Sequence, residues 1–408
     1  MNIIWLTPQF PSSLTNIKGI YIYRTVKELS KYFDIYVICL YPATPPFVEM
    51  IKYWKDWKRI YSDWKINYTN NSSEFMDFGN GKIIYLRYFR LPRGKFHHIE
   101  GWFSYFQARK QLSKIVNSQS IIHANWIFPA GTMASIISKK YKVPFIVSLM
   151  GSDVNRLMKG TKFWRAAKKI LYRADKITAV TEDLFEKCSD KKMHLDNSKI
   201  MQIDNIYESD RFIVKDRKYC RKLLNIDLNK KVIFFAGGLI PVKNVDILIE
   251  AFDILLNEGN DALLYLAGSG TEEGNIRRMI KMKGITNKVF LLGPLQSKDL
   301  INYFNSADLF CLPSKSEGMP NVVIESLFCG TPVVASNVGG IPTLIKDAEN
   351  GFLVPRNKKK LLAKAIEKSF NTVWNREIIR KSVSHLSKDK IIAKYKVLYK
   401  EVSAKGSG

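Results

Sequence analysis

Two carboxylates eight residues apart, Glu317 and Glu325, enclose a short apolar run in the segment LPSKSEGMPNVVIESLFCG. Pro320 suits the first turn of a helix, where a missing N–H costs nothing, and Gly330 suits the end of one. The N-terminus of a helix carries unpaired N–H groups and a partial positive charge, so it binds phosphate readily. The segment therefore predicts an anion site with a carboxylate on either side.

The positions of the two acids suggest what kind of ligand this site takes. Glu317 would lie in the loop before the helix, and Glu325 would lie inside it. Helical side chains lean towards the N-terminus, so both carboxylates could reach hydroxyl groups on either side of a bound phosphate. A nucleoside diphosphate sugar has that layout of ribose, diphosphate and sugar. The spacing alone is weak evidence, because glutamate is common.

A third charged residue, Lys243, lies in a comparable place in FFAGGLIPVKNVDILIEAF, residues 234–252. This stretch is typical of a strand, a glycine turn and a helix. Lys243 precedes the helix, where it could neutralise a leaving diphosphate as a point charge.

Strand-like and helical patterns alternate along both halves of the 408-residue chain. Runs such as NIIWLT and PFIVSLM in the first half, and KVIFFAG and DLFCLPS in the second, are continuously apolar. Such runs, separated by helical patterns, are typical of parallel sheets covered on both faces. The predicted fold class is α/β, with two Rossmann-like lobes. Ligands of such sheets bind at the carboxyl ends of strands, where the charged residues above would lie.

Three segments are predicted from the lapses in this pattern. The first lobe spans residues 1–205 and the second spans residues 206–380, because periodicity lapses after KIMQIDN. Residues 381–405 contain a final amphipathic helix that no strand follows, so it must pack on a lobe already formed. Residues 50–80 are interpreted as an insertion or a long loop.

The composition suggests a cytoplasmic protein with reduced cysteines that binds a polyanion. The net charge is +27, and Lys82 to Lys176 contains 19 Lys or Arg and three acids. A basic, aromatic-rich region fits nucleic acid or an anionic membrane surface, although many lysines could simply lie on solvated faces. The five cysteines are scattered and odd in number, which indicates buried thiols. The N-terminus resembles a strand rather than a signal peptide, and no apolar run could span a membrane.

The segment GMPNVVIESLFCGTPVVA resembles the retaining glycosyltransferases of the GT-B fold, glycosyltransferase family 4 (glycosyl transferases group 1), and the resemblance extends over essentially the whole chain. It implies an active-site cleft between the lobes, with the acceptor in the first and the donor in the second, and a C-terminal helix in residues 381–405 that returns to the first lobe. It also implies that Glu325 binds the ribose and that Glu317 contacts the donor sugar. The implied diphosphate-binding stretch consists of Gly318, Met319, Pro320, Asn321 and Val322, with the amides of Met319, Asn321 and Val322 as the cradle.

Other loops match the family with departures. Gly238 stands where the family commonly has the arginine of G-R-L, which leaves Lys243 or another cation for the diphosphate. Gly268 would allow the backbone to approach the nucleotide, and Leu295 would flank the base. Gly19 matches the N-terminal glycine loop that faces the phosphates and the sugar, although a simple turn glycine would look the same.

In the first lobe, IIHANW and SLMGSDVN resemble the family segments H-A-H-W and H-G-S-D. Asn125 and Met150 replace histidines of those segments. His123 remains, either as a substrate-binding residue or as a structural one. Asp153 is retained and is predicted to orient acceptor or sugar hydroxyls; capping of a helix is the alternative. The predicted catalytic residues are thus Asp153, Glu317 and Lys243.

The resemblance implies a retaining, metal-independent hexosyltransferase that needs no cofactor besides its nucleotide diphosphate sugar, with UDP favoured. The implied acceptor is a hydroxyl of a lipid-linked or polysaccharide acceptor in surface glycan assembly. The expected location is the cytoplasm, with peripheral binding to the inner face of the plasma membrane. FSYFQARKQLSKIV and RLMKGTKFWRAAKKILYR could contact anionic headgroups, or their apolar stripes could be core.

Three alternatives belong to other classes. A nucleotide-sugar epimerase would need more histidines than this chain offers. A nucleic-acid-binding protein would explain the charge, but no RNA-recognition or helix-turn-helix signature occurs, so no nucleic-acid partner is expected. A catalytically weakened or non-catalytic nucleotide-sugar-binding relative is favoured by Met150 and Gly238, whereas Glu317, Lys243 and Glu325 favour an active enzyme.

Overall fold

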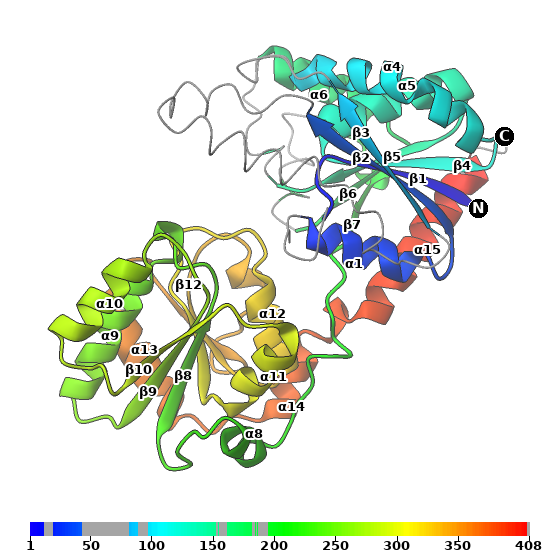
Figure 1. Ribbon diagram of the computed structural model, residues 1–408. Coiled ribbons are helices and arrows are strands. Elements are labelled where there is room, and N and C mark those ends of the chain that lie inside the picture. Colours follow the sequence, from blue (N-terminus) through cyan, green and yellow to red (C-terminus); the bar gives the residue numbers. More distant parts are fainter. Residues whose placement is uncertain are drawn as a thin grey trace, which may run out of the picture. The chain divides into compact units, whose positions relative to one another are not determined.

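The structure is a computed structural model of the chain (Figure 1). It describes residues 1–11, 19–42, 81–88, 97–151, 154, 161–181, 184, 186 and 195–405. The predicted insertion at residues 50–80 lies outside these residues, and so do Asp153 and Cys188. The chain forms two compact units, one of Met1–Ile206 with Asp389–Gly408 and one of Tyr207–Lys388.

The first unit is built on a parallel seven-stranded sheet with the strand order β3-β2-β1-β4-β5-β6-β7. Its strands are β1 (Asn2–Thr7), β2 (Asp34–Pro42), β3 (Lys82–Tyr88), β4 (Ser120–Asn125), β5 (Phe145–Leu149), β6 (Lys176–Ala179) and β7 (Ile200–Gln202). The helices described in it are α1 (Ile20–Leu29), α4 (His97–Ile115), α5 (Thr132–Tyr141), α6 (Lys162–Arg173) and α15 (Lys388–Lys405). Figure 1 shows α4, α5 and α6 on one face of this sheet.

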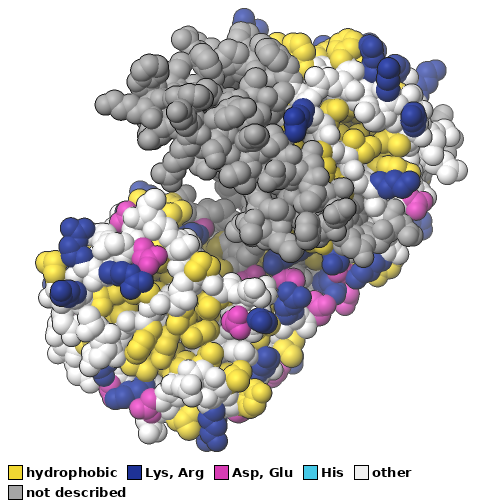
Figure 2. Space-filling view, viewed as in Figure 1, with side chains coloured by type: hydrophobic (Ala, Val, Ile, Leu, Met, Phe, Trp, Pro, Cys, Tyr) yellow, Lys and Arg dark blue, Asp and Glu magenta, His cyan; other side chains and the backbone are white. Residues whose placement is uncertain are grey.

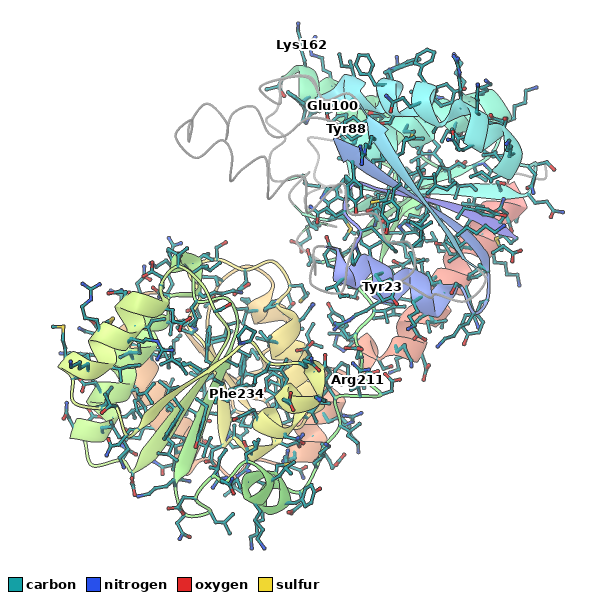
Figure 3. All side chains as sticks on the ribbon, viewed as in Figure 1. Tyr23, Tyr88, Glu100, Lys162, Arg211 and Phe234 are labelled. Atoms are coloured by element: carbon teal, nitrogen blue, oxygen red, sulfur yellow. The ribbon has the colours of Figure 1, made fainter. Side chains whose placement is uncertain are left out.

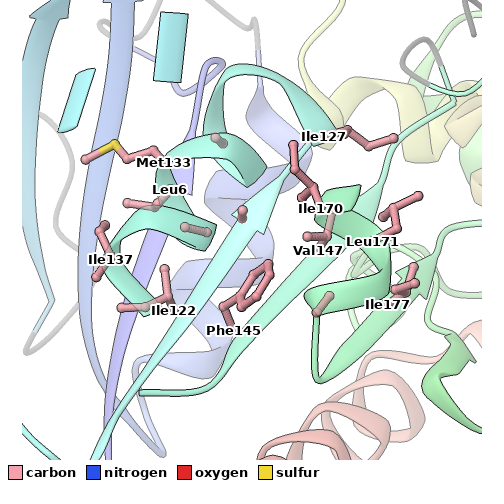
Figure 4. Close-up of a cluster of buried hydrophobic side chains, with 14 of the residues drawn as sticks. Leu6, Ile122, Ile127, Met133, Ile137, Phe145, Val147, Ile170, Leu171 and Ile177 are labelled. Atoms are coloured by element: carbon pink, nitrogen blue, oxygen red, sulfur yellow. The ribbon is translucent and has the colours of Figure 1, made fainter. Parts of the chain in front are cut away.

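Burial of both sheet faces explains the continuous apolar runs in the sequence. Every residue of β4 and of β5 is buried. Phe145 and Val147 of β5 lie in an apolar cluster with Met133 of α5 and Leu171 of α6 (Figure 4). Most side chains on both faces of these strands are therefore apolar, which removes the alternation seen in half-exposed strands.

The second unit contains a parallel six-stranded sheet with the order β10-β9-β8-β11-β12-β13. Its strands are β8 (Lys231–Ala236), β9 (Ala262–Ala267), β10 (Val289–Gly293), β11 (Leu309–Leu312), β12 (Val333–Ser336) and β13 (Gly351–Val354). Its helices are α8 (Arg217–Leu223), α9 (Val245–Asn257), α10 (Glu273–Met282), α11 (Ser297–Ser306), α12 (Asn321–Phe328), α13 (Lys359–Asn371) and α14 (Arg376–Ser382). The two parallel-sheet lobes confirm the predicted fold class. The strand order reverses between β8 and β11, the position where such sheets bind ligands.

The last helix, α15, belongs to the first unit. Its Tyr399 is fully buried, and the Tyr399 hydroxyl lies 2.8 Å from Nδ1 of His123 in β4. Its Glu401 forms an ion pair of 2.6 Å with Lys176 of β6. The apolar stripe of α15 is therefore buried against a sheet that is complete before this helix begins.

Four of the five cysteines, Cys39, Cys220, Cys311 and Cys329, are free and buried. Burial raises the pKa of the Cys39 thiol to about 12, because the thiolate would lose its hydration. These thiols therefore stay protonated and unreactive, as the apolar residues around them in the sequence predict.

Candidate active site

The loops after β8 and β9 are in backbone contact at the carboxyl end of the second sheet. The Leu239 N–H donates to the Ser269 carbonyl over 2.9 Å. Gly268 has a φ of 136°, and a Cβ built on it would lie 1.8 Å from the Gly237 carbonyl oxygen. Only glycine fits this close approach. Gly268 therefore holds these two loops together, in addition to the nucleotide contact predicted from the sequence.

Gly238 stands in a different environment. A Cβ at this position would meet only side-chain carbons of Ile240, at 3.6 to 3.9 Å, which is ordinary van der Waals contact. The backbone of this loop therefore does not require glycine at the position where the family commonly has arginine.

The loops after β8 and β11 bring Lys243 and Glu317 together across 74 residues of sequence. The Lys243 ammonium nitrogen lies 2.7 Å from Glu317 Oε1, and the Ser314 hydroxyl donates to the same oxygen over 2.5 Å. The exposed fractions of the Lys243 and Glu317 side chains are 20% and 9%. The Lys315 N–H donates to the Val242 carbonyl over 2.8 Å, which joins the two loops. The predicted cation and carboxylate thus form one partly buried, charge-assisted pair.

A glycine pair after β12, Gly339 and Gly340, supports the same loop. The Gly340 N–H donates to the Gly318 carbonyl over 2.8 Å, and a Cβ on Gly339 would lie 1.9 Å from the Glu317 carbonyl oxygen. Gly339 has a φ of 57°, where a side chain is strained. Sequence reasoning missed this pair and Ser314. The segment SNVGGIP, with Gly-Gly directly after a buried strand, was the available signal.

Helix α12 begins at Asn321, and Pro320 occupies the cap position with extended backbone angles. The expectation that Pro320 lies in the first helical turn is therefore wrong by one residue; the ring closes the loop before the helix. Among the residues that the structure describes, none accepts a hydrogen bond from the amides of Met319, Asn321 or Val322. These amides are the orphan donors of a helix start, and they remain available to an anion.

Glu325 lies in the fifth position of α12, and only 7% of it is exposed. The other end of this helix is held by two arginines of α14. Arg376 donates to the Cys329 carbonyl over 2.8 Å, and Arg380 donates to the Phe328 carbonyl and, over 2.7 Å, to the Phe212 carbonyl. The guanidinium groups form hydrogen bonds with the last carbonyls of the helix, and their positive charge interacts favourably with the partial negative charge at its C-terminus. The position of α12 is therefore fixed from its C-terminus.

Two further predicted binding residues lie in separate units. Gly19 directly precedes α1 with a φ of 81°, and a Cβ there would lie 2.7 Å from the Gln9 backbone. This crowding explains why a glycine occupies the position, independently of any ligand. Leu295 is half-buried in the loop between β10 and α11.

His123 is fully buried beneath α15, which argues against the predicted substrate-binding role. Its Nδ1 lies 2.8 Å from the Tyr399 hydroxyl, its Nε2 lies 2.6 Å from the Ser148 hydroxyl, and its ring stacks on Trp5 at 4.1 Å. Both ring nitrogens are therefore engaged within the first unit. Burial lowers the pKa of His123 to about 3, so the imidazole is neutral at physiological pH. The structural role is the better interpretation.

This burial predicts a pH-dependent stability. In the unfolded chain the imidazole binds a proton below its ordinary pKa of 6.5, whereas the folded protein binds it only near pH 3. Stability should therefore fall as the pH drops from 6.5, by up to about 1.4 kcal/mol per pH unit from this residue. Urea unfolding of wild type and His123→Gln at several pH values between 7 and 4.5 gives the free energy of unfolding of each protein as a function of pH. If this free energy depends on pH equally in both proteins, this role of the buried imidazole is refuted.

The two family positions that depart from histidine lie side by side. The Asn125 side-chain amide donates to the Met150 sulfur over 3.5 Å, and the Trp5 indole N–H donates to the Asn125 carbonyl oxygen. Asn125 is buried, whereas Met150 is half-buried. Asp153, the third predicted catalytic residue, lies outside the described residues.

Two parallel-sheet Rossmann-like lobes, with charged and glycine-containing loops at the carboxyl edge of the second sheet, have the architecture of the GT-B fold. The sequence matches two family models, Glycosyl transferases group 1 over residues 216–400 and Glycosyl transferase 4-like over residues 86–181. The chain belongs to this family of glycosyltransferases.

The chain is similar along most of its length to the Bacillus subtilis protein named "Putative teichuronic acid biosynthesis glycosyltransferase TuaC". The two are 25% identical over 390 residues, which cover 93% of this chain and 92% of TuaC. Over 46% of the chain, it is 32% identical to 43% of a D-inositol 3-phosphate glycosyltransferase from a Mycobacterium species. Among solved structures, Anabaena Alr3699/HepE in complex with UDP has the same fold, with a TM-score of 0.70 and 17% identity. That match covers 98% of this chain and all of HepE.

Proposed function

We propose that the protein transfers a sugar from a nucleoside diphosphate sugar, most readily a UDP-sugar, to a hydroxyl of a lipid-linked or polysaccharide acceptor, with retention of the anomeric configuration. The observation that carries the proposal is the Lys243–Glu317 pair beside the start of α12. The complexes of HepE with UDP and with UDP-glucose, a protein of the same fold, support the choice of donor.

The charges of the second unit suit a departing diphosphate. The free amides at the start of α12 and the Lys243 ammonium would stabilise the negative charge that develops as the sugar leaves. Lys243 and Ser314 both contact Oε1 of Glu317, so Oε2 is the oxygen that can accept from a donor-sugar hydroxyl. No metal ion is required in this scheme, because the protein itself supplies the positive charge.

Retention requires that the acceptor oxygen attack the face of the anomeric carbon from which the diphosphate departs. The bond between the anomeric carbon and the diphosphate oxygen breaks, the acceptor oxygen bonds the same face of that carbon, and the departing phosphate oxygen takes the acceptor's proton. Glu317 is paired with a lysine and accepts a hydroxyl hydrogen bond, which makes its carboxylate a weak nucleophile. A covalent sugar–enzyme intermediate is therefore disfavoured in this scheme.

The proposed acceptor belongs to the assembly of a surface glycan. The name of TuaC, a relative that matches nearly the full length, supports this class. The proposed place of action is the cytoplasm or the inner face of the plasma membrane. In the parts of the chain that the structure describes, no helix is both long and apolar enough to cross a bilayer.

The second candidate is a weakened or non-catalytic relative that only binds the nucleotide sugar. Met150 and Gly238 favour it, because both replace residues of the family's usual site. The Lys243–Glu317 pair favours the enzyme, because it holds together a cation for the diphosphate and a carboxylate for the donor sugar.

A thermal-shift screen with UDP-, GDP- and ADP-sugars tests the proposal. We expect one donor class to raise the Tm in proportion to the logarithm of its concentration, because ligands that bind only the folded state stabilise it by mass action. The stabilising donor is then incubated with membrane extract, and release of the free nucleoside diphosphate is measured. Stabilisation without any transfer would favour the binding-only candidate, and no stabilisation by any donor would contradict both.

A further inference from the structure

We propose that the outer surface of α4, with the neighbouring cations of α5 and α6, binds an anionic lipid bilayer. This surface is called the α4 surface below. It consists of the exposed aromatic residues Trp102, Phe103 and Phe106 and the exposed Lys or Arg residues of the three helices. It belongs to the first unit, whereas the Lys243–Glu317 pair belongs to the second, and its test needs no donor.

The aromatic part of the α4 surface is unusual for a helix that covers a sheet. The inner stripe of α4, with Tyr105, Ala108 and Leu112, is buried in the core. The exposed fractions on the outer side are 51% for Trp102, 37% for Phe103 and 55% for Phe106. Three large aromatic side chains within one and a half turns form a compact exposed apolar patch, and such patches commonly mark interaction sites.

The same row of α4 continues with cations. Trp102, Phe106, Lys110 and Lys114 follow one another at intervals of four residues, so they lie along one side of the helix. Lys110 and Lys114 are exposed, like the two aromatic residues before them. A row that is aromatic at one end and basic at the other can insert rings at headgroup depth while its lysines contact phosphate.

The two neighbouring helices, α5 and α6, extend the positive charge. Helices α4, α5 and α6 contact one another on the same face of the sheet (Figure 1). They contain three, two and five Lys or Arg residues, which are Arg109, Lys110, Lys114, Lys139, Lys140, Lys162, Arg165, Lys168, Lys169 and Arg173. Figure 2 shows hydrophobic and basic side chains interspersed on the upper part of this unit, and in Figure 3 Lys162 points outward from the start of α6.

Acidic side chains do not offset this charge on the described surface of the three helices. Their single acid is Glu100, which is fully buried and accepts a hydrogen bond of 3.2 Å from the Tyr88 hydroxyl (Figure 3). The surface therefore presents nine exposed cations, with Lys168 half-buried among them, and no exposed carboxylate. Charge of one sign next to exposed aromatic rings complements anionic headgroups over an apolar layer.

The first experiment measures co-sedimentation of the full-length protein with vesicles of phosphatidylcholine alone and of phosphatidylcholine with 30% phosphatidylglycerol. We expect partitioning onto the anionic vesicles to exceed that onto the neutral ones at least tenfold, and to weaken as salt is raised. Equal partitioning onto both, or none onto either, would overturn the proposal.

The second experiment reverses charge on the α4 row. Lys110→Glu/Lys114→Glu should weaken partitioning onto anionic vesicles about tenfold or more, because each basic side chain near such a surface contributes attraction. The control is Lys360→Glu/Lys364→Glu, which makes the same change at the same spacing on exposed positions of α13 in the other unit. If both variants lose vesicle binding equally, the attraction depends only on the net charge of the protein, and the assignment to α4 is overturned.

The third experiment removes the aromatic anchors. Trp102→Ser/Phe106→Ser should weaken partitioning severalfold even at high salt. The control Tyr219→Ser/Leu223→Ser changes two residues of α8 that are 61% and 53% exposed and equally spaced. All four side chains are largely solvated, so folding should survive in both variants. If the α4 variant instead dissociates an oligomer and leaves vesicle binding unchanged, the surface is a subunit contact and the proposal is wrong.

Discussion

Lys243→Met should lower the turnover number of sugar transfer by about 100-fold to 1000-fold, the usual loss when one preorganised group facing a developing charge is removed. Its ammonium is held 2.7 Å from Glu317 between two loops that are pinned by a backbone hydrogen bond. Because the diphosphate gains a further negative charge as the bond to the sugar breaks, this cation should matter more for kcat than for KM. Initial rates of nucleoside diphosphate release give both constants.

Two variants make this prediction specific. Lys360→Met removes an exposed lysine of α13 and should leave kcat unchanged. Gly238→Arg, added to Lys243→Met, should recover part of the activity, because the backbone at Gly238 leaves room for a side chain. A loss below fivefold in Lys243→Met would remove Lys243 from the proposed mechanism.

Glu325→Ala should abolish most of the thermal stabilisation by the donor. At a donor concentration of 100 Kd, wild type gains about 2.7 kcal/mol. The family resemblance implies that Glu325 binds the ribose, and loss of charge-assisted hydrogen bonds to two ribose hydroxyls should weaken binding about 100-fold or more. That leaves less than about 0.5 kcal/mol at the same concentration. Differential scanning fluorimetry over a series of donor concentrations measures this change.

The control must separate donor binding from folding, because Glu325 is buried in α12. Glu100→Ala removes another buried carboxylate, in the other unit, and should lower the Tm of the unliganded protein while keeping the donor shift. Glu325→Gln keeps two polar atoms at the site and should retain part of the shift. If Glu325→Ala shows the wild-type dependence on donor concentration, the ribose role of Glu325 is refuted.

Much of the fold was predictable from local pattern. Continuous apolar runs such as PFIVSLM predict buried parallel strands, and the strand β5 (Phe145–Leu149) is buried throughout. The alternation of strands and helices was enough to predict two lobes with parallel sheets, because two neighbouring parallel strands must be joined by a crossover connection, which is usually a helix. The placement of Glu317 and Lys243 in loops before helices followed from the same alternation.

The sequence by itself determined which residue types reach the carboxyl edge of the second sheet, because loop position follows from local periodicity. It could not determine that Lys243 and Glu317 touch, that Gly339 packs on Glu317, or that His123 is sealed beneath Tyr399. These contacts join residues 22 to 276 positions apart, and strand order and register decide them. The outward row of α4 was undecided for a related reason: helical period shows that a stripe exists, but only packing decides which side of the helix the core covers.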